Sequence, residues 1–393
     1  MTKILFAAYG GGHINAILPV IKYVQRHTDW EIEVLGLTTA GKKLEAEGIP
    51  YIGYKDIIEP NDQAASRIGR DLVKQLDTKL ISYEESVAYM GLSYMDLVNR
   101  VGEVEAKAIF EEKGRQGFLQ LTVMERLLKK VKPDLVVATN SPRSEQALIM
   151  CASMLNIPSI CLVDLFGFIE IEWIRDRRFA NKVCVLNNQI KDVFVKKGRD
   201  EHDIVVTGNP AFDSLADVHL LEEGGSLRTR KQWEGKKVIL WASQPEPGNE
   251  QLPREIEQQL MECVKNHEDW ILVLRFHPSE AIKYSELPDR VEVNIDNLHS
   301  LLHAVDLVVT MTSTVGLEAA LLGKPVISVD LSVYTPDVPY SKMGISKGIT
   351  SLEQLEEASI DALTDNYSNQ WRNANLGKST LNVMKVVRNL IDR

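Results

Sequence analysis

Short apolar runs rich in β-branched residues recur along the chain, and most of them stop at a cluster of small or polar residues. The clearest example is the run LVVT at residues 307–310, which is followed by a hydroxyl cluster at 312–314 and a helical pattern that closes at Gly323. A second apolar run, VISV, follows at residues 326–329. Short apolar runs bounded by turn residues are typical of buried strands, so this segment predicts a strand, a helix and a second strand.

The same pattern appears in both halves of the chain. Residues 54–130 interrupt it with a charged, helical stretch, and the polar stretch EEGG at 222–225 precedes a fresh series of strands. Alternating strands and helices predict parallel α/β sheets, and the change of composition predicts two of them. We expect an N-terminal domain at residues 1–206, with a helical insertion at about 54–130, and a C-terminal domain at 207–377. Strands are expected at residues 3–8, 31–37, 49–52, 132–140, 157–164, 182–186, 205–206, 237–242, 270–276, 291–293, 307–310 and 326–329.

The start of the late helix is a candidate phosphate site. Ser313 and Thr314 can cap this helix, and Gly316 removes a side chain from its first turn. Backbone N–H groups and the positive end of the helix dipole suit a phosphate or pyrophosphate. Glu318 follows, and its carboxylate could reach a ribose hydroxyl on the same ligand. The alternative is that these residues only cap the helix and complement its dipole.

The first strand ends in a glycine-rich loop, Gly10-Gly11-Gly12-His13. Glycines at this place let a ligand lie against the backbone, with His13 at the mouth of the crevice. The motif is not GxGxxG and the next strand does not end in an acidic residue, so a dinucleotide cofactor is disfavoured. Histidine titrates near neutral pH, which makes His13 a candidate general base. The alternative is a histidine that caps the helix or forms a hydrogen bond across the cleft.

Polar side chains also follow two further strands of the first half. Asn140, Arg143, Glu145 and Asp164 stand at or after strand ends, where functional groups collect in parallel sheets. All four are therefore candidates to face the cleft. Arg143 could hold an anionic acceptor, or it could be a capping or surface arginine.

The insertion contains a segment, residues 82–94, that combines tyrosines with carboxylates. Glu85 and Tyr89 could line a sugar-binding wall, and with Asn140 and Arg143 they are the candidate acceptor-binding residues. Tyrosines at this spacing are also typical of a helix that packs on its domain.

Composition narrows the class of protein. The chain has 393 residues, 44% hydrophobic and 25% charged, with a net charge of −10. An acidic surface repels phosphate backbones, so nucleic acid is not expected as a partner. Apolar runs are shorter than the roughly 18 residues of a membrane span, and residues 1–20 do not resemble a signal peptide, so a cytoplasmic location is expected. Four scattered cysteines without CxxC spacing predict buried free thiols and no zinc site.

The chain resembles the GT-B glycosyltransferases, a class with two Rossmann-like doubly wound domains facing a central cleft that also contains the UDP-N-acetylglucosamine 2-epimerases. The resemblance rests on GGGH at 10–13, TGNP at 207–210, RFHP at 275–278, and the Ser/Thr, Glu-Ala and Gly-Lys-Pro groups within 312–325. Members end with a helix that crosses back onto the first domain, and residues 378–393 have the apolar spacing for it. The His-Pro and Ser/Thr pairs are also similar to sialyltransferases, Kdo transferases and CDP-glycerol transferases, which leaves uridine or cytidine open.

The resemblance implies that the C-terminal domain binds a nucleotide-sugar donor and that the N-terminal domain binds the acceptor. It implies that Ser313 and Thr314 contact the phosphates and that Glu318 contacts the ribose. The other implied donor-binding residues are Ser243 and Gln244 near the phosphates, His277 near the base or ribose, and Gly11, Gly12, Arg275, Pro278 and Thr312.

Glycosyl transfer requires a base for the acceptor hydroxyl and stabilisation of the departing phosphate. We expect His13 as the base, with Asp164 as the second candidate. Enzymes of this class can act without a bound metal, and the strand ends lack a DxD-like motif, so we expect metal independence and no cofactor. The first hypothesis is an inverting glycosyltransferase that moves a UDP- or CMP-linked sugar to a hydroxyl acceptor in bacterial-type surface polysaccharide or glycolipid synthesis. A glycolipid acceptor would add peripheral membrane association.

Two alternatives stay open. A UDP-N-acetylglucosamine 2-epimerase, hydrolysing or not, would need several acidic residues and an arginine that converge on one sugar. A non-catalytic nucleotide-sugar-binding protein is disfavoured because polar strand ends occur in both halves. The sugar, the acceptor, the stereochemistry and the oligomeric state are not indicated by the sequence.

Overall fold

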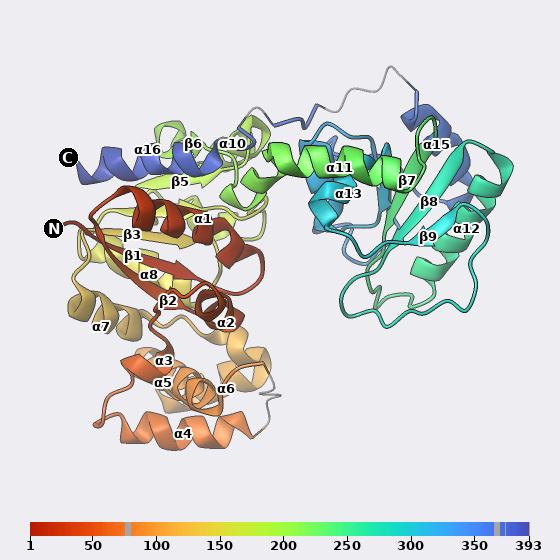
Figure 1. Ribbon diagram of the computed structural model, residues 1–393. Helices are drawn as coiled ribbons and strands as arrows, with labels where there is room; N and C mark the ends of the chain where they lie inside the picture. Colours follow the sequence, from red (N-terminus) through yellow and green to blue (C-terminus); the bar gives the residue numbers. More distant parts are fainter. Residues whose placement is uncertain (75–79, 365–369, 374, 393) are drawn as a thin grey trace. The chain divides into compact units, whose positions relative to one another are not determined.

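The computed structural model describes residues 1–74, 80–364, 370–373 and 375–392 (Figure 1). The chain forms two compact units, Met1–Ala211 with Lys378–Arg393, and Phe212–Gly377. Within the described residues, no helix is long and apolar enough to cross a membrane. All four cysteines are buried free thiols.

A six-stranded parallel sheet forms the centre of each unit (Figure 1). In the first unit the strand order is β2-β1-β3-β4-β5-β6. These strands are β1 (Lys3–Ala8), β2 (Glu31–Gly36), β3 (Leu135–Thr139), β4 (Ser159–Leu162), β5 (Lys182–Val185) and β6 (Ile204–Val206). In the second unit the order is β12-β11-β10-β7-β8-β9. These strands are β7 (Lys237–Ala242), β8 (Trp270–Arg275), β9 (Val291–Val293), β10 (Leu307–Thr310), β11 (Val326–Val329) and β12 (Lys347–Ile349).

Helices connect and cover the strands of both sheets. Those of the first unit are α1 (Gly12–His27), α2 (Thr39–Ala46), α3 (Tyr54–Ile57), α4 (Gln63–Val73), α5 (Tyr83–Val101), α6 (Glu103–Lys113), η1 (Gly114–Gly117), α7 (Leu121–Val131), α8 (Ser144–Met154), α9 (Ile171–Ile174), α10 (Asn188–Lys196), η2 (Glu201–Asp203) and α16 (Ser379–Ile391). The remainder are η3 (Pro210–Ala216), α11 (Val218–Arg230), α12 (Leu252–Asn266), α13 (Leu298–Ala304), α14 (Thr314–Leu321), η4 (Leu352–Gln354) and α15 (Leu355–Ala362). The prediction of a two-sheet α/β fold with a helical insertion is confirmed.

The strand orders fix where each unit can bind a ligand. In the first sheet the order reverses between β1 and β3, and in the second between β7 and β10. Loops that leave the carboxyl ends of two such strands run to opposite faces of the sheet and leave a crevice between them. The loops after these four strands therefore frame the candidate ligand site of each unit.

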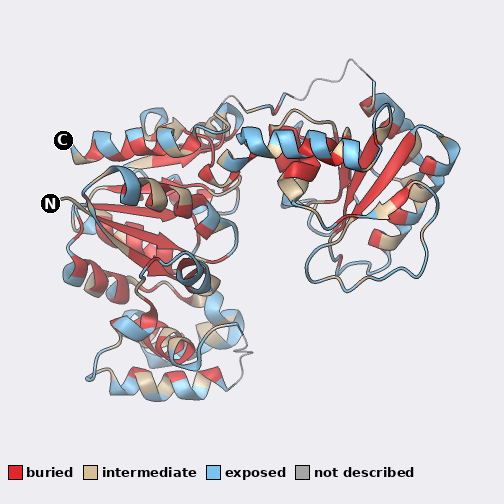
Figure 2. Cartoon of the chain, viewed as in Figure 1, coloured by how far each residue is buried: buried red, intermediate tan, exposed pale blue. Residues whose placement is uncertain are grey.

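Buried strands form the cores of the two units, as Figure 2 shows. Helix α16 packs on the first unit, where Val383, Met384 and Val387 share an apolar cluster with Ile17 and Ile21 of α1. The apolar positions of α16 lie three or four residues apart, which places them on one face of the helix.

Glycines let two helices of the insertion, α4 and α5, pack closely against each other. Helices α4 and α5 cross so closely that a Cβ atom at Gly69 would lie 2.1 Å from the Val87 carbonyl oxygen. A Cβ atom at Gly91 would lie 2.0 Å from the carbonyl oxygen of Ala65. Such contacts are far inside van der Waals distance, so both positions require glycine.

Two local predictions were wrong. The strand expected at residues 49–52 is reduced to a single bridge between Ile52 and Leu35, because α3 begins two residues later. The polar stretch at 222–225 lies inside α11 and is not a linker. Gly224 is buried there, and a Cβ atom would lie 2.8 Å from the Ser300 carbonyl oxygen of α13, so the glycine serves helix packing.

The boundary between the units falls between Ala211 and Phe212, a few residues after the predicted one. The reason is that the segment at 207–209 is bonded to the first unit. The N–H groups of Thr207 and Gly208 both donate to the Val185 carbonyl, at 3.1 and 3.3 Å. The side chain of Asn209 donates to the backbone carbonyl of Asp164.

Candidate active site

A buried carboxylate joins the ends of the two strands at the first switch point. Glu145 lies in the first turn of α8 and is fully buried. One of its oxygens accepts the Tyr9 N–H at 2.6 Å, and the other accepts the Thr139 N–H at 2.6 Å and the Thr139 hydroxyl. Burial raises the pKa of this carboxyl, and His13 and the donated hydrogen bonds lower it. Glu145 therefore ties the loop after β1 to β3.

The same hydrogen bonds determine which nitrogen of His13 carries a proton. Thr139 gives its single hydroxyl proton to Glu145, so its oxygen acts as an acceptor towards the Nδ1 atom of His13, 2.7 Å away. In the neutral ring the proton then resides on Nδ1, and Nε2 keeps its lone pair. This is the form in which a histidine can act as a general base.

Asp164 adds a carboxylate beside the imidazole. One oxygen of Asp164 lies 3.7 Å from Nδ1 of His13, and the other accepts the Leu165 N–H at 2.8 Å. The Asp164 backbone N–H donates to the side chain of Asn140 at 2.9 Å. A Cβ atom at Gly12 would lie 3.1 Å from the Asp164 carboxylate, so this glycine lets the acid approach the loop. The structure thus brings together four predicted residues: Gly12, His13, Asn140 and Asp164.

Glu170 belongs to the same cluster and was missed by the sequence analysis. Burial raises the pKa of its carboxyl, and the charge of Asp164 raises it further, while a hydrogen bond with Asn140 lowers it. Its signal in the sequence was weak, because it is one of two acids in the otherwise apolar segment at 165–174 and does not follow a strand. With Glu170, the cluster contains three carboxyl groups and one imidazole.

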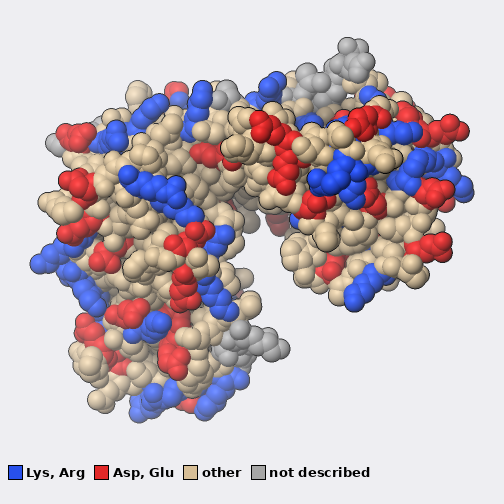
Figure 3. All heavy atoms as spheres, viewed as in Figure 1, with Lys and Arg blue, Asp and Glu red and all other residues tan. Residues whose placement is uncertain are grey.

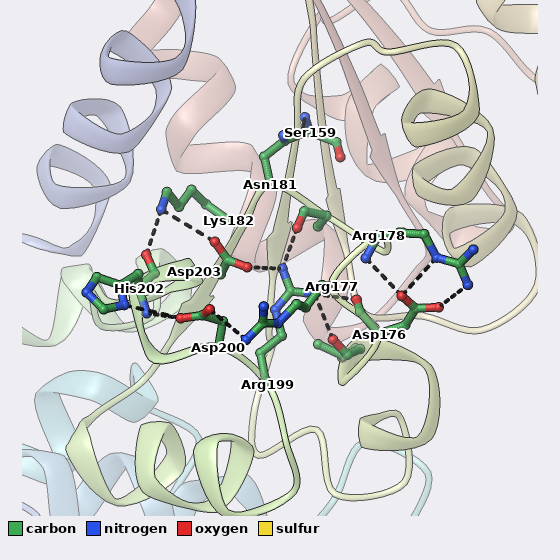
Figure 4. A network of polar contacts seen from close by, with 12 residues as sticks. Ser159, Asp176, Arg177, Arg178, Asn181, Lys182, Arg199, Asp200, His202 and Asp203 are labelled. Carbon is green, nitrogen blue, oxygen red and sulfur yellow. Dashed lines mark hydrogen bonds and ion pairs between the residues drawn. The ribbon is translucent and has the colours of Figure 1, made fainter.

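A buried arginine holds the segment that follows Glu170 (Figure 4). The guanidinium of Arg199 donates to three backbone carbonyls between Ile174 and Ala180 and pairs with Asp203 at 3.3 Å. Its side chain is fully buried. These carbonyls lie at the end of α9 or just after it, and Glu170 directly precedes α9, so Arg199 anchors the end of the short helix that Glu170 begins.

Two of the four predicted acceptor-binding residues line a cavity of about 320 Å³ in the first unit, whereas Asn140 lies beside Asp164. Tyr89 and Glu85 line it together with Tyr9. The carboxylate of Glu85 is used locally, because it accepts the N–H groups of Tyr54 and Lys55 at 2.8 and 3.0 Å and so caps α3. A direct sugar contact by this carboxylate would have to replace or share those bonds.

Arg143 lies beside this cavity. Its backbone adopts a positive φ of 71°, an uncommon conformation for a residue other than glycine. Its guanidinium lies 5.5 Å from the centre of the Tyr9 ring, in cation–π geometry. Gly11 also has a positive φ, of 69°, with open space where a side chain would stand. Both residues therefore lie at the rim of the first switch point.

The second switch point contains the predicted phosphate site. Ser313 caps α14 by accepting the Val315 N–H at 3.3 Å, and Thr314 is the first residue of the helix. The side chain of Gln244 joins the two loops, since it accepts the Thr312 N–H at 3.0 Å and donates to the Thr312 hydroxyl at 2.9 Å. Gln244 thus orients the start of α14.

Two residues of α14 depart from expectation. Gly316 is buried, and a Cβ atom there would lie 2.8 Å from a side-chain carbon of Thr310, so it accommodates the protein's own packing. Glu318 is nearly buried, and its carboxylate lies 3.4 Å from Nε2 of His299. His299 was not predicted as a site residue from the sequence. His299 in turn lies 3.3 Å from the Ser214 hydroxyl.

The remaining predicted donor residues take part in internal contacts. Ser243 donates to Glu280 at 2.9 Å and accepts from Arg254 at 2.7 Å. Glu280 also accepts the backbone N–H of His277 at 2.9 Å, so it fixes the loop after β8. Arg275 donates to the Asp296 carbonyl. Pro278 is exposed, next to the exposed ring of His277.

The surface charge is mixed. On the face drawn in Figure 3, acidic and basic side chains alternate over both units. Local clusters, and not a large field of one sign, must therefore recognise charged ligands on this face.

The family model of UDP-N-acetylglucosamine 2-epimerase matches residues 111–332. This stretch contains Asn140, Asp164, Glu170 and the start of α14, and it begins after the loop that carries His13. A comparison with curated proteins found no significant match.

Solved structures resemble the whole chain. The S. aureus protein MnaA, in a co-structure with UDP, is 16% identical, with a TM-score of 0.61 and coverage of 100% of this chain and 98% of that chain. The Neisseria meningitidis UDP-GlcNAc 2-epimerase bound to UDP-GlcNAc is 15% identical, with a TM-score of 0.60 and coverage of 98% and 100%. The glycotransferase of kitacinnamycin is 15% identical, with a TM-score of 0.59 and coverage of 99% of both chains.

At these identities the structural likeness establishes the fold, which both epimerases and glycosyltransferases share. The family assignment rests on the sequence model, which spans more than half of the chain. On that ground, the protein belongs to the UDP-N-acetylglucosamine 2-epimerase family.

Proposed function

We propose that the protein is a UDP-N-acetylglucosamine 2-epimerase. The observation that carries the proposal is the cluster of His13, Asp164 and Glu170 at the first switch point, in a chain of this family. From the sequence, a glycosyltransferase was the first hypothesis, because an epimerase would need several acids and an arginine that converge on one sugar. Glu170 adds a further acid beside Asp164, and the family model adds independent support, so the epimerase hypothesis is now favoured.

C2 is not adjacent to a carbonyl carbon, so loss of its proton has to be coupled to departure of UDP from C1: the electron pair of the C2–H bond forms a C1–C2 double bond as the C1–O bond breaks. Return of UDP to C1 and of a proton to the other face of C2 completes the inversion. Nε2 of His13 is available to accept a proton, because Nδ1 is bonded to Thr139. Burial raises the pKa of the Glu170 carboxyl, which favours its protonated form and suits an acid that donates a proton. We assign His13 and Asp164 to proton transfer and Glu170 to a supporting or second acid–base role.

The second unit would bind the nucleotide part of the substrate. The backbone at the start of α14, capped by Ser313 and oriented by Gln244, suits the diphosphate. The S. aureus and N. meningitidis proteins were solved with UDP and with UDP-GlcNAc, which favours uridine over cytidine as the base. Glu318, paired with His299, is the candidate for the ribose hydroxyls.

Incubation with UDP-N-acetylglucosamine in D₂O tests the proposal. Proton NMR should show deuterium entering C2 and the manno-configured product appearing, without an added acceptor and with CMP-linked sugars inert. We expect the same rate in EDTA, since metal independence stays a prediction. Release of UDP that requires an added hydroxyl acceptor, with C2 unlabelled, would assign a transferase instead. Binding of UDP-N-acetylglucosamine without either change would indicate a non-catalytic binding protein.

Replacement of Thr139 by valine tests how His13 is oriented. Valine keeps the shape of threonine but cannot accept a hydrogen bond from the Nδ1–H group of His13. We therefore expect kcat to fall about tenfold, with little change in KM. Thr139→Ser should restore most of kcat. The diagnostic measurement is the pH dependence of kcat. If the contact with Thr139 were merely structural, its loss would leave the midpoint of this pH profile unchanged.

Glycosyl transfer is the second candidate function. The observation in its favour is the cavity beside His13, which could admit an acceptor next to a histidine whose Nε2 atom is free to take a proton. The same assay separates the two reactions, since only a transferase needs the acceptor.

A further inference from the structure

We infer that the cavity lined by Tyr9, Tyr54, Tyr89 and Arg115 binds a small organic acid: an apolar body that carries one carboxylate or phosphate group. The cavity, of about 320 Å³, lies between the loop after β1, helices α3 and α5, and η1. The inference does not depend on the proposed epimerase activity, because binding can be measured without turnover.

The walls of the cavity favour an apolar body. Leu37 and Met90 contribute aliphatic side chains, and three tyrosines contribute rings. The polar groups of the wall are largely occupied by the protein itself. The hydroxyl of Tyr54 lies 2.9 Å from that of Ser144, and the carboxylate of Glu85 caps α3. A neutral polar ligand would therefore meet few groups that still need a hydrogen-bond partner.

Two guanidinium groups supply the preference for an acid. Arg115 lines the cavity, and Arg143 stands over the Tyr9 ring. Burial raises the pKa of the Tyr89 hydroxyl, and the charges of Arg143 and Arg115 lower it, so both guanidinium groups act near this wall residue. Among the residues that the structure describes, neither guanidinium has a carboxylate within 4.0 Å or a hydrogen-bond acceptor. Two cations that are not paired with a carboxylate are complementary to an anionic head, since the one carboxylate that lines the cavity, Glu85, already accepts two backbone N–H groups.

The cavity lies next to the acid–base cluster, so a bound acid could take part in the reaction or regulate it. The ring of Tyr9 forms part of the wall and meets the His13 ring edge to face, with centroids 6.4 Å apart. The ligand would thus lie next to the acid–base cluster of the first unit. It would be either a second substrate or a regulator that contacts the His13 loop.

Titration calorimetry with small probes tests the inference. Phenyl phosphate and benzoate combine an apolar ring with a phosphate or a carboxylate, whereas benzamide and inorganic phosphate each lack one of the two parts. We expect at least one of the two aryl acids to bind at least about tenfold more tightly than benzamide and inorganic phosphate. The comparison between phosphate and carboxylate identifies the head group. Affinity should fall as NaCl is added, because the arginines lie near the surface.

Arg115→Gln and Arg143→Gln should each weaken binding of the aryl acid about tenfold. Lys113→Gln is the matched control, since Lys113 is an exposed cation two residues away that does not line the cavity. Ser86→Leu, which fills the cavity from α5, should abolish binding, with circular dichroism checking the fold. Equal affinity for benzamide and the aryl acids, or equal effects of the Arg115 and Lys113 variants, would overturn the inference.

Discussion

The His13→Ala variant is expected to lose about 10²–10⁴-fold in turnover of UDP-N-acetylglucosamine while it keeps its affinity for UDP. The physical reason is that Nε2 of His13 is the free nitrogen of an imidazole fixed by Thr139 at 2.7 Å, beside Asp164. The measurement is kcat for the C2 exchange in D₂O, together with a calorimetric titration with UDP.

His219→Ala is the matched control for this prediction. His219 is a histidine whose side chain is 89% exposed, so its removal should leave both quantities unchanged. Full turnover by His13→Ala, with UDP bound normally, would remove His13 from the chemistry. Asp164 and Glu170 would then be the remaining candidates for proton transfer.

The Arg199→Met variant is expected to lose about 3–5 kcal/mol in the free energy of unfolding of the first unit. Methionine fills much of the same volume but removes the donors to the Ile174 and Ala180 carbonyls and the closer of the two ion pairs of Asp203, which keeps only Lys182 at 3.8 Å. Unpaired buried acceptors are costly, so the loss should exceed that of an ordinary surface change. Urea unfolding followed by tryptophan fluorescence measures it, with Trp173 of α9 as a nearby reporter.

Arg178→Met provides the control, since Arg178 belongs to the same segment and its side chain is 87% exposed. Its effect should stay within about 0.5 kcal/mol. Arg199 itself contacts no group assigned to proton transfer, so any loss of kcat in Arg199→Met would arise from displacement of the segment that follows Glu170. A change of less than about 1 kcal/mol for Arg199→Met would contradict the role given to this arginine.

The phosphate-binding hypothesis at α14 illustrates what local pattern can predict. Strand β10, helix α14 and strand β11 lie where the apolar runs and the hydroxyl cluster place them, and Ser313 does cap the helix. The purpose of Gly316 was misjudged, because its neighbour is Thr310 and not a ligand. Local sequence indicates that a small residue is required, but not which atom approaches it.

The candidate site was predicted in part. His13, Asp164 and Asn140 are brought together, as expected of residues at the ends of neighbouring strands. Glu170 and Arg199 were missed, since neither stands at a strand end or in a recognisable motif. Their roles arise from a short helix and a buried guanidinium whose partners are backbone carbonyls.

The sequence by itself determined the two parallel sheets, their helical insertion and the polar strand ends. It could do so because apolar periodicity, glycines and helix caps act between residues that are close along the chain. Only the tertiary structure decided which polar groups meet. The bond between Thr139 and His13 joins residues 126 positions apart, and that between Tyr9 and Glu145 joins residues 136 apart. Such pairs, and with them the protonation form of the histidine, depend on the order of strands in the sheet, which local pattern does not encode.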